Sequence, residues 1–276
     1  MSLLRTDFDF VRELVRKRTG IVLDERQSYL ADSRLGPIAR QLGIEDMAEL
    51  VRRSRLSPEG NEARSLVEAM TTNETSFFRD LHPFETLRTQ ILPELMEKRR
   101  SEKRINIWCA ACSTGQEPYS IAMMLHEHFG GLSDWRFQIT ATDISTPVLE
   151  RAREGLFNQL EAGRGLPAVL LVKHFQREGA QWRIKSNFRS AIDWRHLNLV
   201  EAWPSFPMFD VIFIRNVLIY FSPETRKSIV DRLARQLRRD GSVFLGSSES
   251  LIGVTDSLTG VQVGRSTVFR HHQSEK

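Results

Sequence analysis

The sequence predicts an α/β protein, in which a doubly wound, mostly parallel sheet follows an all-helical domain and carries a small inserted antiparallel β-subdomain. Three observations predict this architecture. Residues 1–72 show apolar residues at helical spacing and no strand-like alternation. From residue 104 onward, apolar segments of strand length alternate with helical segments, which is typical of a parallel sheet. Residues 155–190 interrupt that alternation with several glycines and a proline.

The first part of the chain is predicted to be a small helical domain that a longer helix joins to the rest. The predicted helices cover 7–18, 29–42, 47–53 and 58–70, and the longer one covers 80–100. We therefore divide the 276 residues into an N-terminal domain of residues 1–72 and a second domain of residues 73–276.

The second domain is predicted to alternate strands with helices. The segment 209–214 is nearly all apolar, as a central strand covered on both faces should be. Within the insertion at about 155–190 we expect a short helix and a hairpin that includes 181–185. The other predicted strands are 104–109, 135–143, 191–195, 242–245 and an edge strand at 261–269. One predicted helix ends at residue 129, and two others cover 148–153 and 223–237.

The segment 108–120 joins an apolar strand to a helix through a loop of small residues. This is the first half of a nucleotide-type site in an open α/β sheet, and Gly115 permits close approach of the backbone to a ligand. The glycine pattern that cradles a pyrophosphate is missing, and the helix opens with the carboxylate of Glu117, which repels phosphate and attracts a cation. The loop therefore favours S-adenosylmethionine, which has an adenosine, a sulfonium and an ammonium but no phosphate.

Asp143 ends the next predicted strand and is the candidate acid for the ribose of this cofactor. It lies 28 residues beyond Gly115, whereas the dinucleotide pattern places its acid about 20 residues on, and the longer connection here explains the difference. The alternative is that Asp143 caps the helix that begins near Ser145.

Composition excludes several other classes of function. The formal charge of +4 raises nucleic acid as a partner, but residues 1–72 hold 12 basic and 12 acidic side chains, and no zinc-finger or RRM pattern occurs. We therefore expect no nucleic-acid partner. No run of about 18 apolar residues occurs and the first ten residues lack the apolar core of a signal peptide, so we expect a cytoplasmic protein with no membrane insertion.

The cysteines and histidines do not predict a redox or metal site. Cys109 and Cys112 form a C-x-x-C pair, but the following helix opens with Glu117, which disfavours a reactive thiolate. Two thiols do not complete a zinc site, and His126 and His128 are two apart on a helix and do not share a face. We expect no metal.

Four segments form a highly specific combination in this order behind a helical domain: MTTNETSFFRD at 70–80, CSTGQEPYSIAMM at 112–124, ATDIS at 141–145 and FDVIFIRNVLIYF at 209–221. Together they resemble the CheR family of chemotaxis receptor methyltransferases over nearly the whole chain. The resemblance implies a sheet of the S-adenosylmethionine-dependent methyltransferase type. It also implies methyl transfer to glutamate side chains on receptor signalling helices, with S-adenosylhomocysteine as the product.

The resemblance also implies a set of site residues, since each of them stands in a matching motif. Asn198 follows a strand and would face the adenine edge. The family's loop usually carries two acids before its proline, and here the first position holds Gln116. The implied cofactor contacts are Asn73, Thr75, Arg79, Glu117, Asp143, Asn198, Leu199, Arg215 and Asn216.

Arg79 and Tyr220 are the implied catalytic residues. A glutamate with a pKa of about 4.3 is already ionised at neutral pH, so its attack on a methyl group needs no general base. Arg79 can hold a carboxylate through paired N–H donors, and Tyr220 can hydrogen-bond the acceptor. The Pro-Pro-Tyr run of many nitrogen methyltransferases is missing after strand 209–214, which disfavours nucleic-acid and amide substrates.

Receptor recognition in this family is associated with basic residues of the N-terminal domain, and here Arg26, Arg34 and Arg40 are the candidates. The alternative is a solvated basic face. Pro37 stands where the family often has another arginine, and it is expected to bend or shorten its helix.

The predicted hairpin of the insertion is joined by a compact turn at 176–181. In family members that dock a pentapeptide at the receptor C-terminus, this connection is longer and richer in glycine. We therefore expect an enzyme that recognises the methylation helices directly and does not depend on a receptor pentapeptide. We also expect it to be a monomer.

Two other functions remain open from the sequence. One is a non-catalytic S-adenosylmethionine-binding receptor adaptor, which the intact Arg79 and Tyr220 disfavour. The other is a small-molecule carboxyl methyltransferase, which would not need residues 1–72 for recognition, so deletion of that domain separates the two readings.

Overall fold

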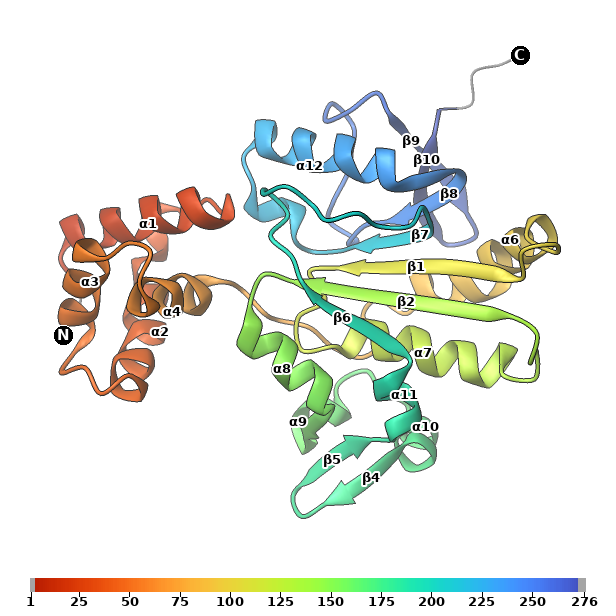
Figure 1. Cartoon of the computed structure of the whole chain (residues 1–276), viewed down its shortest axis with the longest axis horizontal. Coiled ribbons are helices and arrows are strands. Elements are labelled where there is room, and N and C mark those ends of the chain that lie inside the picture. The colour runs from red at the N-terminus through yellow and green to blue at the C-terminus, as the bar shows by residue number, and fades with distance from the viewer. Residues whose placement is uncertain (1–2, 273–276) are drawn as a thin grey trace. The chain divides into compact units, whose positions relative to one another are not determined.

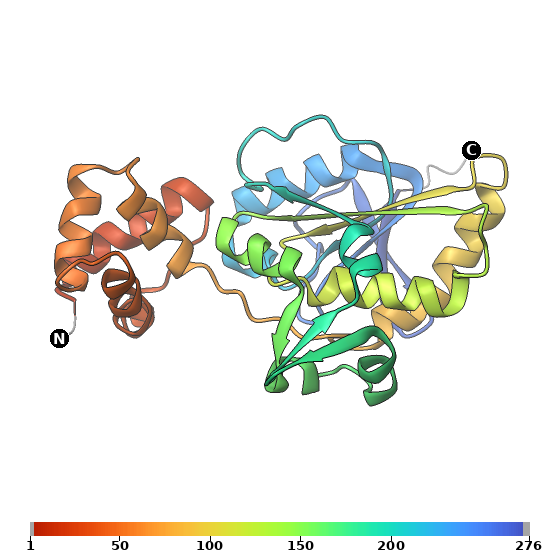
Figure 2. The same cartoon turned by 60° about the horizontal axis from the view of Figure 1, so that its bottom comes forward.

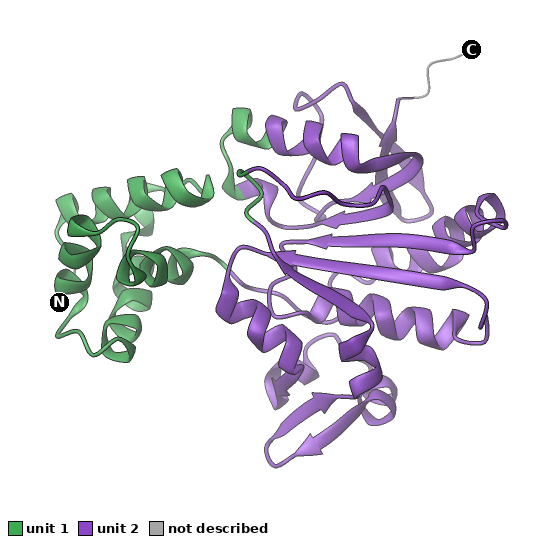
Figure 3. Ribbon diagram, viewed as in Figure 1, with its two compact units in different colours: residues 1–72, 198–201, 220–226 green, residues 73–197, 202–219, 227–276 purple. Residues whose placement is uncertain are grey.

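A computed structural model describes residues 3–272 of the chain (Figure 1). The described chain separates into two compact units, shown in different colours in Figure 3. Unit 1 comprises residues 1–72, 198–201 and 220–226, and unit 2 comprises residues 73–197, 202–219 and 227–276. No helix within residues 3–272 is both long enough and apolar enough to cross a membrane.

Unit 1 contains the four predicted helices around a small apolar core that includes Leu35, Leu50 and Leu66. Pro37 lies inside its helix, which still continues to Gln41, so the proline does not end it. The elements are α1 (Arg5–Thr19), the 3-10 turn η1 (Glu25–Gln27), α2 (Ser28–Gln41), α3 (Met47–Leu56) and α4 (Asn61–Met70).

The core of unit 2 is a seven-stranded sheet with the order β6-β2-β1-β7-β8-β10-β9. Strands β6, β2, β1, β7 and β8 run parallel, which confirms the predicted mostly parallel sheet. Every residue of β7 is buried, as expected for a central strand. The strands are β1 (Arg104–Ala110), β2 (Arg136–Asp143), β6 (Ile192–His196), β7 (Phe209–Ile214), β8 (Leu237–Phe244), β9 (Leu258–Val263) and β10 (Ser266–His271).

The end of the chain differs from the prediction of one edge strand at 261–269. This segment is a hairpin, because β9 and β10 pair antiparallel and Val263 faces Ser266 across a two-residue turn. Gly264 adopts φ +58°, a conformation that glycine enters without steric cost.

Helices cover both faces of the large sheet (Figure 1). The predicted helix at 80–100 is a continuous run with one irregular segment, since a π-turn at Leu87–Ile91 precedes Pro93, which has no amide N–H to donate. The helices are α5 (His82–Thr86), η2 (Leu87–Ile91), α6 (Leu92–Lys98), α7 (Gln116–Phe129), α8 (Thr146–Glu154) and α12 (Pro223–Gln236), with the 3-10 turn η3 at Leu218–Tyr220.

The predicted insertion forms a separate three-stranded antiparallel sheet with the order β3-β5-β4. Figure 2 shows it beyond α7, on one side of the large sheet. Phe77 anchors it, because its ring contacts Phe157 and Phe175 with centroids 5.0 and 5.7 Å away. The elements are β3 (Leu156–Asn158), α9 (Gln159–Gly163), α10 (Ala168–His174), β4 (Phe175–Glu178), β5 (Gln181–Ile184) and α11 (Ser186–Ser190).

Candidate functional site

The loop between β1 and α7 has an unusual backbone. Ala111 and Ser113 adopt φ values of +56° and +51°, although neither is a glycine, and Gly115 follows at +92°. Such conformations cost free energy and are found mainly where function requires a particular loop shape. The loop lies at the carboxyl end of a central parallel strand, where open α/β sheets bind their ligands.

Gly115 is required by packing within the protein. A Cβ atom at this position would lie 2.9 Å from the Trp194 ring, 3.1 Å from the Ala152 Cβ and 3.2 Å from the Tyr119 ring. The sequence suggested that this glycine permits close approach of a ligand. The structure gives a different reason, because the space beside Gly115 is filled by the chain's own side chains.

Asp143 ends β2 and is 6% exposed. One carboxylate oxygen accepts a hydrogen bond from the Ser145 N–H at 3.0 Å, and the other accepts one from the Ser113 N–H at 2.9 Å. Burial raises the pKa of Asp143, while these backbone donors oppose the rise. Asp143 therefore supports the helix entry at Ser145, as the capping alternative proposed, and also joins it to the cofactor loop. A carboxylate has about four lone-pair sites, so Asp143 can accept a further donor besides these backbone groups.

Glu117, in the first turn of α7, belongs to a buried ion-pair network. The Arg215 guanidinium, 2% exposed, lies 3.0 Å from the Glu117 carboxylate and 2.6 Å from that of Asp80. It also donates to the Arg79 carbonyl at 2.9 Å. Burial raises the pKa of Glu117, and the neighbouring Arg215 opposes the rise. This network fixes the start of α7 to the segment that contains Arg79.

The raised pKa of Glu117 makes cation binding depend on pH. A cationic ligand lowers this pKa, so its affinity should rise with pH through the interval between the bound and free values, by up to about tenfold per pH unit for one released proton. The stability of the free protein should change with pH in the opposite direction. A buried carboxyl with a raised pKa contributes stability that is present below its unfolded pKa and is lost as the pH rises through its folded pKa. Calorimetry with S-adenosylmethionine in buffers of different ionisation enthalpy measures the released proton, and Glu117→Gln should flatten the dependence; an equal slope in both proteins would contradict it.

A surface cavity of about 470 Å³ lies beside this loop. The hydroxyl of Ser113 donates to the Asn73 carbonyl at 2.8 Å, which ties the segment 73–75 to the loop. Arg79 donates to the Glu74 carbonyl at 3.1 Å. The residues that line the cavity include Asn73, Glu74, Thr75, Thr114, Gln116, Pro147, Val148 and Arg151.

Two buried polar atoms at the end of β7 have no hydrogen-bond partner among the described residues. They are the Arg215 Nε and the Asn216 Oδ1. A buried acceptor without a donor is costly unless a ligand satisfies it. S-adenosylmethionine fits this donor and acceptor set, because its hydroxyls and ammonium donate while Asp143, Glu117 and Asn216 accept. The site residues placed together in unit 2 are Asn73, Thr75, Arg79, Glu117, Asp143, Arg215 and Asn216.

Family models match both parts of the chain. The description "CheR methyltransferase, all-alpha domain" matches residues 6–71, and "CheR methyltransferase, SAM binding domain" matches residues 73–266. The chain belongs to the CheR methyltransferase family. The match to the second description confirms S-adenosylmethionine as the cofactor, and it spans all the proposed cofactor contacts.

Curated relatives in the CheR family align over almost the whole chain. The chain is 41% identical to chemotaxis protein methyltransferase 1 of Pseudomonas aeruginosa, over 98% of this chain and 99% of the relative. It is 39% identical to chemotaxis protein methyltransferase Cher2 of Pseudomonas putida over the same shares. The chemotaxis protein methyltransferase of Vibrio parahaemolyticus is 39% identical over 95% of each chain.

Three of the proposed site residues belong to unit 1. The Asn198 amide donates to the Arg18 carbonyl at 2.7 Å and to the Glu201 carboxylate at 2.9 Å. Leu199 is buried, and the Tyr220 carbonyl accepts the Val22 N–H at 2.8 Å. Their roles at the cofactor and acceptor remain predictions from the family resemblance.

The three arginines proposed for receptor recognition also belong to unit 1, but their environments differ. Arg26 and Arg40 are exposed. Arg34 is half-buried, and its guanidinium donates to the carbonyls of Met70 and Thr71 at 3.2 and 2.9 Å. Arg34 therefore caps the last turn of α4, whatever else it contacts.

Both cysteines are free and buried, and burial raises the pKa of both thiols well above the ordinary value.

The structure also contains a cluster that the sequence did not predict. Possible ligand atoms of His126, Glu127 and His174 lie within 4.8 Å of one another. Glu127 pairs with His174 and with the Lys173 ammonium, both at 2.7 Å. The Lys173 ammonium already pairs with this carboxylate, so the contacts form a partly exposed polar network.

Proposed function

We propose that this protein transfers the methyl group of S-adenosylmethionine to glutamate side chains of chemotaxis receptors, forming glutamate methyl esters and S-adenosylhomocysteine for sensory adaptation. The observation that carries the proposal is the alignment of both domains, over nearly full length, with chemotaxis protein methyltransferases. We further propose that it acts in the cytoplasm as a monomer.

The chain's task in this reaction is positioning. S-adenosylmethionine supplies an electrophilic methyl group when bound, and the acceptor glutamate is already ionised, so no side chain has to remove a proton. Asp143 would accept from the ribose hydroxyls, while Glu117 and Asn216 would accept from the ammonium. Alignment of two reactants can contribute about 7 to 11 kcal/mol in favourable cases.

Arg79 and Tyr220 are the residues proposed to hold the acceptor. The Arg79 guanidinium donates from Nη1 to the Glu74 carbonyl, and its other N–H groups can hold a carboxylate. The Tyr220 hydroxyl would donate to the same acceptor. Asn198 and Leu199 are proposed at the adenine, and residues 1–72 are proposed to recognise the receptor.

The function is tested with labelled S-adenosylmethionine and purified receptor cytoplasmic fragments. We expect base-labile methyl ester on the receptor, lost in Arg79→Ala and reduced in Tyr220→Phe, which should bind S-adenosylhomocysteine almost normally. Cofactor binding without any transfer would favour the adaptor function. Methylation of small carboxylates that survives deletion of residues 1–72 would favour a small-molecule enzyme.

The same assay tests independence from a receptor pentapeptide. Only Gly179 and Ala180 join β4 to β5, so the hairpin offers a short edge for an added strand. We expect receptors with and without a C-terminal peptide to be methylated alike, because no tether raises the effective concentration. A large loss on removal of the tail, together with micromolar peptide affinity, would overturn this.

Arg40 is the better probe of receptor recognition, because Arg34 also caps α4. Charge reversal by Arg40→Glu should raise the Michaelis constant for an acidic receptor helix by about threefold to tenfold, with little change in kcat. The wild-type rate at low receptor concentration should fall as salt rises, since exposed charges are screened within about 8 Å at physiological ionic strength. Rates that do not respond to salt would count against this role, and Arg64→Glu on α4 is the matched control.

A further inference from the structure

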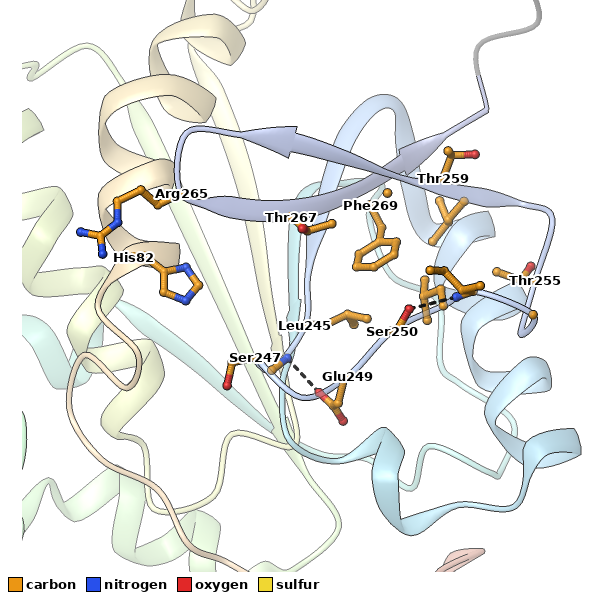
Figure 4. A pocket seen from close by; sticks show the side chains of 16 residues that line it. His82, Leu245, Ser247, Glu249, Ser250, Thr255, Thr259, Arg265, Thr267 and Phe269 are labelled. Atoms are coloured by element: carbon orange, nitrogen blue, oxygen red, sulfur yellow. Dashed lines mark hydrogen bonds between the residues drawn. The ribbon is translucent and has the colours of Figure 1, made fainter.

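Glu249 lies in the loop after β8, on the wall of a surface cavity of about 670 Å³ (Figure 4). Its carboxylate accepts backbone hydrogen bonds from five residues. One oxygen accepts the N–H groups of Asn216 and Gly246 at 2.6 and 2.8 Å. The other accepts those of Val217, Leu218 and Ile219 at 3.0, 2.8 and 3.3 Å.

The four N–H groups from 216 to 219 belong to the turn that follows β7, formed by Asn216 and Val217 together with the start of η3. Asn216 adopts φ +57°, and successive N–H groups around such a residue form a concave anion-binding nest. Here the anion is the protein's own side chain. Without the Glu249 carboxylate, the partial positive charges of these N–H groups would repel one another, and the turn would have no common acceptor.

Gly246 brings the ends of β7 and β8 together in this arrangement. A Cβ atom at Gly246 would lie 2.5 Å from the Asn216 Nδ2 and 2.8 Å from the Glu249 carboxylate. The two strand ends and the carboxylate therefore occupy one tightly packed clamp. The position of Asn216 is set by this clamp, and its side-chain Oδ1 remains a buried acceptor with no partner among the described residues.

We propose that Glu249 is a positioning residue for methyl transfer, because it holds the turn that presents Arg215 and Asn216 at the carboxyl end of β7. This inference rests on the proposed function, in which those two residues contact the cofactor. Glu249 acts through them and through the turn. A glutamine would not substitute, since its amide group places N–H donors where the backbone N–H groups need an acceptor.

The experiment compares Glu249→Gln and Glu249→Asp with Asp256→Asn, which removes an exposed carboxylate from the same loop. We expect Glu249→Gln to lower kcat about tenfold or more while the Michaelis constant for receptor stays within about twofold. Glu249→Asp keeps the charge and should recover part of the rate. Asp256→Asn should behave like the wild type.

Hydrogen exchange gives a readout that does not depend on activity. The amides of residues 217–219 should exchange faster in Glu249→Gln, while those of β7 keep their protection. The proposal would be overturned if Glu249→Gln methylated the receptor at the wild-type rate, or if its amides at 217–219 exchanged as in the wild type. Uniform loss of protection across β7 would also overturn it. If the wild-type protein methylates no receptor, the proposed function fails, and the exchange data together with S-adenosylhomocysteine affinity still decide whether Glu249 positions the turn.

Discussion

Asp143→Ala is expected to weaken the binding of S-adenosylhomocysteine by at least about tenfold. A hydrogen bond to a charged group contributes about 1.5 to 3 kcal/mol, and each factor of ten in affinity corresponds to about 1.4 kcal/mol. The variant loses the proposed ribose contacts and also the acceptor of the Ser113 and Ser145 N–H groups. Calorimetry on the folded variant measures the affinity.

Two further variants separate the ribose contact from support of the loop. Asp143→Asn keeps the shape of the side chain and one oxygen, so it should bind more tightly than Asp143→Ala but below the wild type. Asp134→Ala removes an exposed acid that precedes the same strand and should bind normally. Wild-type affinity in a folded Asp143→Ala protein would remove Asp143 from the site.

Arg215→Met is expected to reduce the free energy of unfolding by about 3 to 5 kcal/mol, because removal of one partner leaves buried charge without compensation. The substitution exposes Glu117 and Asp80 to each other and leaves the Arg79 carbonyl without this donor. Denaturant unfolding, followed by a probe within residues 73–197, measures the loss.

The matched control for Arg215 is Arg195→Met, which breaks a half-exposed pair with Asp193 and should cost about 0 to 1 kcal/mol. A second substitution also tests the explanation. Glu117→Gln in the Arg215→Met background should restore stability, since it removes one uncompensated charge. Equal losses for Arg215→Met and Arg195→Met would show that burial of the network contributes little.

The parts of the fold that the sequence predicted well are those with local signals. The segment 209–214, apolar except for Asp210, predicted a central strand, and the helix predicted to open at Glu117 begins at Gln116. Asp143 was predicted at the end of a strand, and it is the last residue of β2. The compact turn at Gly179 was likewise local, and the hairpin it joins is present.

The parts that were missed depend on contacts between distant positions. Glu249 stands 30 to 33 residues from the four amides it accepts at 216–219, and no spacing rule connects the two. Arg34 and the end of α4 are about as far apart in the sequence. The pattern of α2 suggested a receptor contact for Arg34 and gave no sign that it caps α4. Residues 198–201 and 220–226 join unit 1 although neighbouring residues form the sheet. Only tertiary packing determines such assignments.

Both thiols are buried in β1 and the loop that follows it, so their reaction with a reagent can report local opening of this part of the protein. Only a thiolate attacks an alkylating reagent or a disulfide, and Cys109 and Cys112 are held neutral and covered in the closed protein. Labelling must therefore wait until β1 and its loop separate from their surroundings. The rate of thiol labelling therefore measures how often that separation occurs. A ligand bound at the loop should slow the labelling, and a ligand of higher affinity should slow it more.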